Sequence, residues 1–200
     1  MIINIIYFIF AYLLGNVLGG KIISILYKED FSQYGSGNIG ARNAGRILGP
    51  KAFLFVATVD IFKGFLIVIM LKLFNAEAKI IAICILLVVL GHIKPIAFGF
   101  KGGKGVATFV GTLLALSPNL VFVLILGFLL ISFITRSTTI GFYSTLPSLI
   151  YIHYLDFRSL TASAVLALVL ALLFFVARED IKKAFKKYFA PVRKRPVKRT

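Results

Sequence analysis

The chain has 200 residues, of which 60% are hydrophobic, and its mean hydropathy is +0.97. Soluble domains are closer to half apolar, so this composition excludes an ordinary water-soluble fold and indicates an integral membrane protein. The 23 Lys and Arg against 7 Asp and Glu give a formal net charge of +16, which in a soluble chain would suggest a nucleic acid partner. In a membrane protein the positive-inside rule and anionic lipid explain this charge better, so we expect no nucleic acid partner.

Apolar segments in chain order define the expected fold. A spanning helix needs about 20 apolar residues. The candidate segments lie at 2–26, 52–74, 80–98, 106–116, 119–134, 140–152 and 160–176. No basic region precedes the first segment, so we interpret it as a retained span rather than a signal peptide. The sequence therefore predicts an all-α polytopic membrane protein with about seven transmembrane helices, in a single helical domain over residues 1–176.

The fourth segment, Val106 to Leu116, is short for a membrane span. As a helix it reaches only about 16 Å, whereas the hydrocarbon core is about 30 Å thick. Either the helix continues through the glycine-rich loop at 99–105, or that loop enters the membrane. Irregular backbone at depth is tolerated only where protein or a water-filled cavity satisfies it. We therefore expect a short or partly re-entrant fourth element beside a polar pocket.

Basic residues distinguish the two ends of the expected bundle. Ten Lys and Arg residues follow Val176, so we place this end of the chain in the cytoplasm. Seven crossings then put the N-terminus outside, and the outer loops hold only Lys72, Lys79 and Arg158. This asymmetry supports seven spans. It predicts a multi-pass protein of the cell (inner or plasma) membrane whose polar loops face the cytoplasm.

The C-terminal segment, residues 177–200, is expected to be a basic amphipathic tail. Four lysines fill one face of the predicted helix. The apolar residues recur at the spacing of the opposite face: Ile181, Ala184, Phe185, Tyr188 and Phe189. This pattern predicts a helix that lies on an anionic leaflet, with no catalytic role implied.

The polar segment 28–51 contains the first of two glycine-rich stretches. Gly35 to Gly40 matches Gly-x-Gly-x-x-Gly, but the dinucleotide interpretation needs a preceding strand, and a membrane helix precedes this stretch instead. Bare backbone combined with donor side chains suits a phosphate group. The candidate phosphate-binding residues here are Ser36, Gly37, Asn38, Arg42, Asn43 and Arg46. A helix from Ala41 onward would place Arg42 and Arg46 on one face.

The second glycine-rich stretch is the loop at 99–105. Its glycines let backbone N–H groups approach an anion, its lysines add charge, and the following helix adds a positive dipole end. Three glycines in five residues exceed what an ordinary basic loop needs, so phosphate binding is favoured. Phe98 and Gly105 stand where a Walker A loop needs glycine and Ser or Thr, which excludes that motif. The candidate phosphate-binding residues are Lys101, Gly102, Gly103 and Lys104.

Ionisable residues in the apolar segments add further candidates. His92 either donates to a phosphate or acts as an acid or base, with a histidine satisfied by backbone near a helix end as an equal alternative. Asp60 and Lys63 are three residues apart, and we expect them to form an intramembrane pair that supports the pocket. His153 is interpreted as structural.

Missing motifs exclude several chemistries. Neither histidine begins a His-x4-Asp motif, and the chain has no Gly-x-Ser-x-Gly. The seven acids are scattered, without a carboxylate cluster suited to magnesium, which argues against kinase and phosphatidyl-transfer chemistry. We therefore expect no metal and no other cofactor.

The two glycine-rich stretches resemble motifs of the bacterial membrane glycerol-3-phosphate acyltransferases that use acyl phosphate, the PlsY family. The segment 36–43 followed by Arg46 is similar to the first motif, with Arg42 where threonine is common. Gly91-His92-x-x-Pro95 and the segment 100–108 are similar to the second. The third motif, commonly Arg-His-Arg-x-Asn, is replaced by Val-Ala-Arg-Glu-Asp at 176–180. Only Arg178 and Glu179 carry over from it, as possible support.

The resemblance implies transfer of a long-chain acyl group from acyl phosphate to the 1-hydroxyl of sn-glycerol 3-phosphate. The products would be lysophosphatidic acid and inorganic phosphate, in an early step of phospholipid biosynthesis. The expected catalytic residues are Ser36, His92, Arg46 and Lys104. We expect catalysis by positioning and electrostatic stabilisation, with a substrate phosphate oxygen taking the hydroxyl proton. No obligate protein partner is expected beyond the lipid bilayer.

Two other classes of protein share some of these features. A transporter or channel for a phosphorylated anion also lines its pathway with basic groups. The chain shows no evident inverted halves, however, and its charged loops gather on one side. A membrane scaffold that binds anionic lipid through its tail would leave both glycine-rich stretches unexplained.

Overall fold

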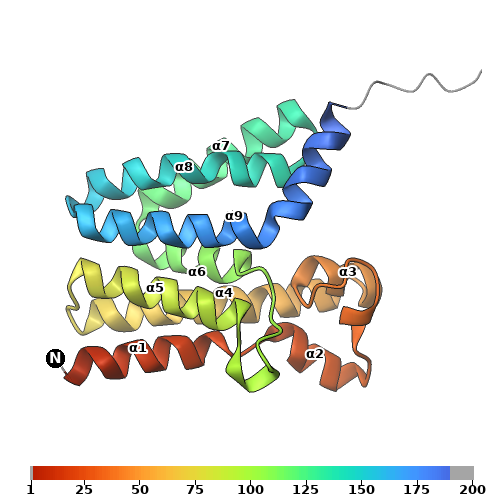
Figure 1. Cartoon of the computed structure of the whole chain (residues 1–200), viewed down its shortest axis with the longest axis horizontal. Coiled ribbons are helices and arrows are strands. Elements are labelled where there is room, and N and C mark those ends of the chain that lie inside the picture. The colour runs from red at the N-terminus through yellow and green to blue at the C-terminus, as the bar shows by residue number, and fades with distance from the viewer. Residues whose placement is uncertain (1, 190–200) are drawn as a thin grey trace, which may run out of the picture.

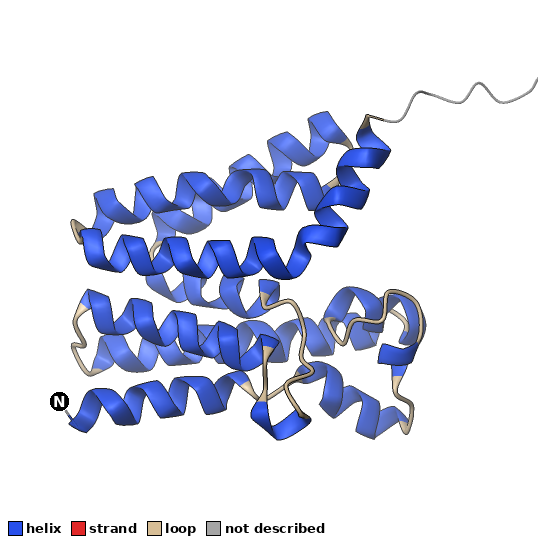
Figure 2. Ribbon diagram, in the orientation of Figure 1, coloured by secondary structure: helices blue, strands red, loops and turns tan. Residues whose placement is uncertain are grey.

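The computed structural model describes residues 2–189, and within that range it is built of helices and connecting turns (Figure 2). The helices are α1 (Ile2–Gly15), α2 (Gly19–Tyr27), α3 (Ala41–Leu48), α4 (Pro50–Leu73), α5 (Ala78–Ile93), α6 (Val106–Leu116), α7 (Pro118–Thr135), α8 (Thr138–Phe157) and α9 (Leu160–Tyr188). Two 3-10 turns, η1 (Phe31–Gln33) and η2 (Ile96–Phe98), lie in the connections. The expected all-α membrane fold is confirmed.

The membrane elements differ in length. Five segments of the described chain are long and apolar enough to cross a membrane: Ile2–Tyr27, Pro50–Leu73, Ala78–Phe98, Pro118–Thr135 and Leu160–Tyr188. Helix α6 has 11 residues and the bounds that the sequence predicts. Helix α8 has 20 residues, with Pro147 inside it, and is longer than the predicted segment 140–152.

The helices run back and forth, so that the connections gather at two ends of the bundle (Figure 1). One end holds the segment between α2 and α4, the connection from α5 to α6, the turn between α7 and α8, and the last turns of α9. We call it the loop end. The start of α1 and the remaining turns lie at the opposite end. Both glycine-rich stretches thus share one end of the bundle, which is the arrangement that seven alternating crossings require.

Glycines let the helices at the centre of the bundle approach closely. A Cβ on Gly64 of α4 would collide with the Thr108 carbonyl, and a Cβ on Gly111 of α6 would collide with the Ile61 carbonyl. Small residues allow such backbone contact between membrane helices, where packing rather than hydrophobic exclusion drives association. The crossing of α4 and α6 fixes where the glycine-rich loop at 99–105 ends.

The first span is not the continuous helix that the sequence predicts, because the chain leaves the helix at Asn16–Leu18, between α1 and α2. Gly15 packs against the backbone of Gly91 on α5, with no room for a Cβ. The freed carbonyl oxygens of Gly15 and Val17 accept hydrogen bonds from Lys63 Nζ, at 3.2 and 2.6 Å. Freed backbone groups at membrane depth need such partners, so a buried cation stabilises the break.

The last span also differs from the expectation, because α9 continues past Val176 to Tyr188. The expected boundary at 176/177 therefore lies inside one helix. Phe185, Tyr188 and Phe189 are exposed, in keeping with an amphipathic helix. Its place on a lipid surface remains a prediction, and the rest of the expected tail, residues 190–200, lies outside the described residues.

The tight helix crossing predicts that Gly111→Ala lowers stability. The added methyl group meets the Ile61 carbonyl and forces α4 and α6 apart, at a cost of about 1–3 kcal/mol. Thiol labelling of Cys84, the only cysteine and a buried one, would report a lower unfolding temperature in detergent. Leu114→Ala, on the same helix but 46% exposed, serves as the control with little change. An unshifted transition in Gly111→Ala would contradict the tight crossing.

Candidate active site

Four buried polar side chains from three helices meet behind the glycine-rich loops. Asp60 and Lys63 come from α4, His92 from α5 and Thr108 from α6. Lys63 Nζ lies 3.0 Å from Asp60 Oδ1 and 2.7 Å from His92 Nδ1. Thr108 Oγ1 lies 3.2 Å from the same imidazole nitrogen. The expected Asp60–Lys63 pair is present, and the structure adds His92 and Thr108 to it.

This network determines which nitrogen of His92 can donate. The Lys63 ammonium can only donate, and it shares its three N–H groups among Asp60, the carbonyls of Gly15 and Val17, and His92 Nδ1. This contact favours the neutral tautomer in which Nδ1 accepts and Nε2 carries the proton. Nε2 faces Gly103, where a Cβ would collide with the ring. The Gly103 N–H donates to the His92 carbonyl oxygen at 3.1 Å. His92 thus presents an N–H donor, rather than a free base, toward the glycine-rich loop.

The loop at 99–105 depends on backbone conformations that favour glycine. Gly105, the N-cap residue of α6, has a φ of 79°, and a Cβ on Gly102 would collide with the His92 carbonyl. The loop therefore lies flat against the end of α5. Lys101 is exposed, whereas Lys104 reaches α9 and forms an ion pair with Asp180.

Asn43 organises the first glycine-rich stretch. Its Oδ1 accepts the Ser36 N–H at 2.9 Å, and its Nδ2 donates to the carbonyls of Phe31 and Tyr34 at 3.2 and 3.0 Å. The residue is only 2% exposed. Both ends of the amide are thus occupied, and Asn43 builds the turn that presents Ser36 at the surface.

Helix α3 carries the two arginines of this stretch. It begins at Ala41, so that Arg42 and Arg46 lie one turn apart on one face, as a helix from this residue was expected to place them. Arg42 donates to Thr138 Oγ1 of α8 at 3.1 Å, which joins the two halves of the loop end. Within residues 2–189, Arg46, Lys101, the Asn38 amide and the Ser36 hydroxyl make no hydrogen bond or ion pair, so they remain available to a ligand.

A cleft of about 400 Å³ separates the glycine-rich loop from α9. It combines cations with aromatic side chains: Lys94, Lys101, Arg178, Phe100 and Phe175 line it together with Glu179. The Arg178 guanidinium lies over the Phe175 ring at 4.4 Å, and Glu179 lies 3.3 Å from Lys182. Asp180 is not among the residues predicted for the site, although it is the last residue of the segment 176–180 that replaces the third motif. That place in the segment was the available signal.

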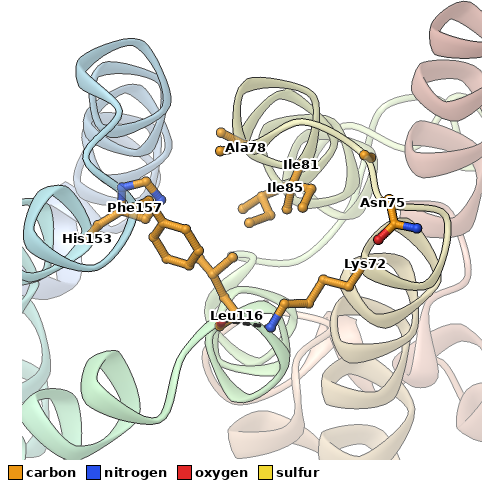
Figure 3. Close-up of a pocket in the computed structure, with 10 residues that line it drawn as sticks. Lys72, Asn75, Ala78, Ile81, Ile85, Leu116, His153 and Phe157 are labelled. Atoms are coloured by element: carbon orange, nitrogen blue, oxygen red, sulfur yellow. Dashed lines mark hydrogen bonds between the residues drawn. The ribbon is translucent and has the colours of Figure 1, made fainter.

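A second cavity, of about 380 Å³, lies at the opposite end of the bundle (Figure 3). Lys72 on its wall donates to the carbonyls of Ala115 and Leu116, both at 3.0 Å, and so closes the end of α6. His153 Nδ1 lies 2.8 Å from Ser163 Oγ, in keeping with the structural role expected for it. Lys72, the lysine that lines this cavity, thus already donates to the carbonyl end of α6. The cavity is therefore a poor phosphate site.

The described part of the chain holds no group of three or more His, Cys, Asp or Glu side chains placed to bind a metal ion. Its polar features are instead exposed donors, two glycine-built loops and a buried Asp–Lys–His network, all at one end of a helical bundle. These features are those of an integral membrane protein whose exposed donors gather at one end of the bundle. The family model of glycerol-3-phosphate acyltransferase matches residues 5–187, and the chain belongs to this family.

Individual relatives agree with this assignment. The chain is 36% identical over 182 residues to glycerol-3-phosphate acyltransferase 2 of Bacillus anthracis, covering 90% of this chain and 94% of the relative. It is 41% identical over 134 residues to the glycerol-3-phosphate acyltransferase of Finegoldia magna, covering 66% and 67%. Crystal structures of PlsY (YgiH), an integral membrane glycerol 3-phosphate acyltransferase, superpose with TM-scores of 0.83 in the glycerol 3-phosphate form and 0.81 in the lysophosphatidic acid form. Identity is 33%, with 92% of this chain and 93% of the other covered.

The buried network predicts that Lys63→Met is strongly destabilising. The substitution leaves the Asp60 carboxylate buried without its cation, at a cost of about 3–5 kcal/mol. The unfolding temperature from Cys84 labelling should fall steeply. The double variant Asp60→Leu, Lys63→Met should recover part of the loss, because it removes the orphan charge. A single variant as stable as the unmodified protein would show that the network does not hold the fold.

Proposed function

We propose that this protein transfers a long-chain acyl group from acyl phosphate to the 1-hydroxyl of sn-glycerol 3-phosphate, releasing lysophosphatidic acid and inorganic phosphate. The observation that carries the proposal is the gathering of two glycine-built loops and unpaired donors at one end of the bundle. Both proposed substrates carry a phosphate group, and one is a lipid. The similar PlsY structures in glycerol 3-phosphate and lysophosphatidic acid forms support the same assignment.

The donors divide into groups that contact substrate and groups that hold them in place. Phosphate contacts are assigned to Ser36, Gly37, Asn38, Arg42, Arg46, Lys101, Gly102, Gly103 and Lys104. Asn43 shapes the turn before α3, since its amide is already occupied. Asp60 and Lys63 hold His92, while Arg178 and Glu179 line the cleft beside α9.

The proposed reaction does not need a protein side chain as its base. The acceptor hydroxyl oxygen bonds to the acyl carbon, the carbon–oxygen bond to phosphate breaks, and phosphate leaves with the electron pair. An acyl phosphate is a mixed anhydride with a good leaving group. Because the edge of His92 that faces Gly103 is a donor, the hydroxyl proton passes to a phosphate oxygen of the substrate instead. Lys104 and Arg46 stabilise the departing phosphate, and backbone N–H groups stabilise the acyl oxyanion.

The proposed location follows from charge. The loop end carries Arg42, Arg46, Lys101 and Lys104 and continues into the basic C-terminal segment. By the positive-inside rule this end faces the cytoplasm, in the inner or plasma membrane. The substrates would then be reached from the cytoplasmic side, with no protein partner required.

The direct test supplies detergent-purified protein with glycerol 3-phosphate and palmitoyl phosphate, and with palmitoyl-CoA in parallel. We expect phosphate release that depends on both substrates, with formation of lysophosphatidic acid, and no product from palmitoyl-CoA. Absence of turnover with every donor, in protein shown to be folded by Cys84 protection, would contradict the proposal. Flux of phosphorylated anions into vesicles would then be measured instead.

Replacing the proposed phosphate ligands should remove activity while the fold is retained. Lys104→Gln and Arg46→Gln should each lower kcat/KM by about 10²–10³-fold, because each removes a charge that stabilises the leaving phosphate. Lys79→Gln, an exposed lysine paired with Glu77 at the opposite end, is the matched control and should keep full activity. Retention of activity in Lys104→Gln would remove the glycine-rich loop from the proposed site.

The donor role of His92 is tested by two amides of different reach. Glutamine can place an N–H donor near the position of Nε2, whereas asparagine reaches only the position of Nδ1. His92→Gln should therefore keep about tenfold more activity than His92→Asn, in line with the typical contribution of one hydrogen bond to a charged group. Cys84 protection would verify folding of both variants. Equal loss in both, as large as that of Lys104→Gln, would indicate proton transfer by His92.

A further inference from the structure

We propose that Asp180 is the counter-ion of Lys104 and determines how tightly the site holds a phosphate group. Its carboxylate pairs with the Lys104 ammonium group, which the proposed function assigns to phosphate binding. A substrate therefore exchanges with Asp180 rather than entering an unopposed positive site. This inference rests on the proposed function and extends it to a residue outside the two glycine-rich stretches.

The geometry places Asp180 on the lysine of the glycine-rich loop. Lys104 Nζ and Asp180 Oδ2 form an ion pair that joins this loop to α9. The side chains are 26% and 44% exposed, respectively, so the pair lies at the accessible surface of the loop end. Ion pairs with this exposure are weak and can exchange with a competing anion, unlike the buried Asp60–Lys63 pair.

Two other carboxylates at the loop end have different partners. Glu179 lies beside Arg178 and Lys182 on its own helix, at 3.7 and 3.3 Å. Asp30 lies 3.6 Å from Lys21. Within residues 2–189, Asp180 is thus the acid that pairs with a cation of the two glycine-rich stretches.

Competition for Lys104 has a consequence for selectivity. A carboxylate and a phosphate both accept from the same ammonium, and the two anions repel each other. Asp180 therefore weakens the hold on any phosphate group. Inorganic phosphate offers only phosphate contacts, whereas a substrate adds glycerol hydroxyls or an acyl chain. Asp180 thereby keeps the site from remaining filled by released phosphate.

The test compares Asp180→Asn with the unmodified protein. The substitution removes the competing charge and keeps the side-chain size. The inhibition constant of inorganic phosphate and the KM for glycerol 3-phosphate or palmitoyl phosphate should fall about two- to fivefold, with kcat unchanged. Glu77→Gln removes an equivalent carboxylate from an exposed ion pair at the opposite end, where it lies 2.9 Å from Lys79, and should change neither constant.

A binding measurement separates this inference from the proposed function. Inorganic phosphate, titrated at constant ionic strength, should raise the unfolding temperature from Cys84 labelling at lower concentration in Asp180→Asn than in the unmodified protein. This difference between the two proteins should vanish in a Lys104→Gln background, because the effect of Asp180 acts through that lysine. This readout decides the matter even if no acyl transfer occurs, which would contradict only the proposed function.

Other results would overturn the inference. A higher KM in Asp180→Asn would mean that the carboxylate orients Lys104 for the substrate. A lower kcat with unchanged KM would place Asp180 in the chemical step. Equal phosphate stabilisation of both proteins, no stabilisation of either, or a shift that persists without Lys104 would each show that Asp180 is not its competing counter-ion.

Discussion

The ammonium group of Lys63 is the interaction on which the loop end depends. It binds the Asp60 carboxylate, His92 Nδ1 and the carbonyl of Val17 within 3.0 Å, and so joins α4, α5 and the break before α2. A charge in a membrane span is costly unless its surroundings compensate for it, and here the compensation comes from groups that themselves needed partners. The same contacts orient the imidazole toward Gly103. The position of the loop at 99–105, which packs against His92, thus depends on one buried cation.

Much of the fold could be read from the chain because apolar length is a strong signal. Helix α6 has its predicted bounds, and α3 begins at Ala41, the start that places Arg42 and Arg46 on one face. The break at Asn16–Leu18 could not be foreseen, because it arises from contact between Gly15 and Gly91, residues far apart in sequence. Hydropathy reports whether a segment is apolar and carries no information about which helix it crosses.

In the candidate site, too, the sequence predicts some features and tertiary contacts determine the others. Glycines and cations identified the two stretches, because phosphate binding needs those residue types close together in sequence. The different roles of the residues in these two stretches depend on tertiary contacts. Asn43 is buried in its own turn, Arg42 reaches Thr138, and Lys104 meets Asp180 from α9. Residue type suggests which groups can bind an anion, and only packing shows which of them are already engaged.

The two ends of α6 have a consequence for the response of the site to salt. Its negative end is neutralised by the Lys72 ammonium, and its positive end opens at Gly105 beside Lys104. Exposed arginines and lysines lose much of their attraction as ionic strength rises, whereas a helix end within a low-dielectric bundle is screened far less. The site therefore combines a salt-sensitive component from its side chains with a salt-resistant component from its backbone. Anion binding would weaken in concentrated salt without disappearing.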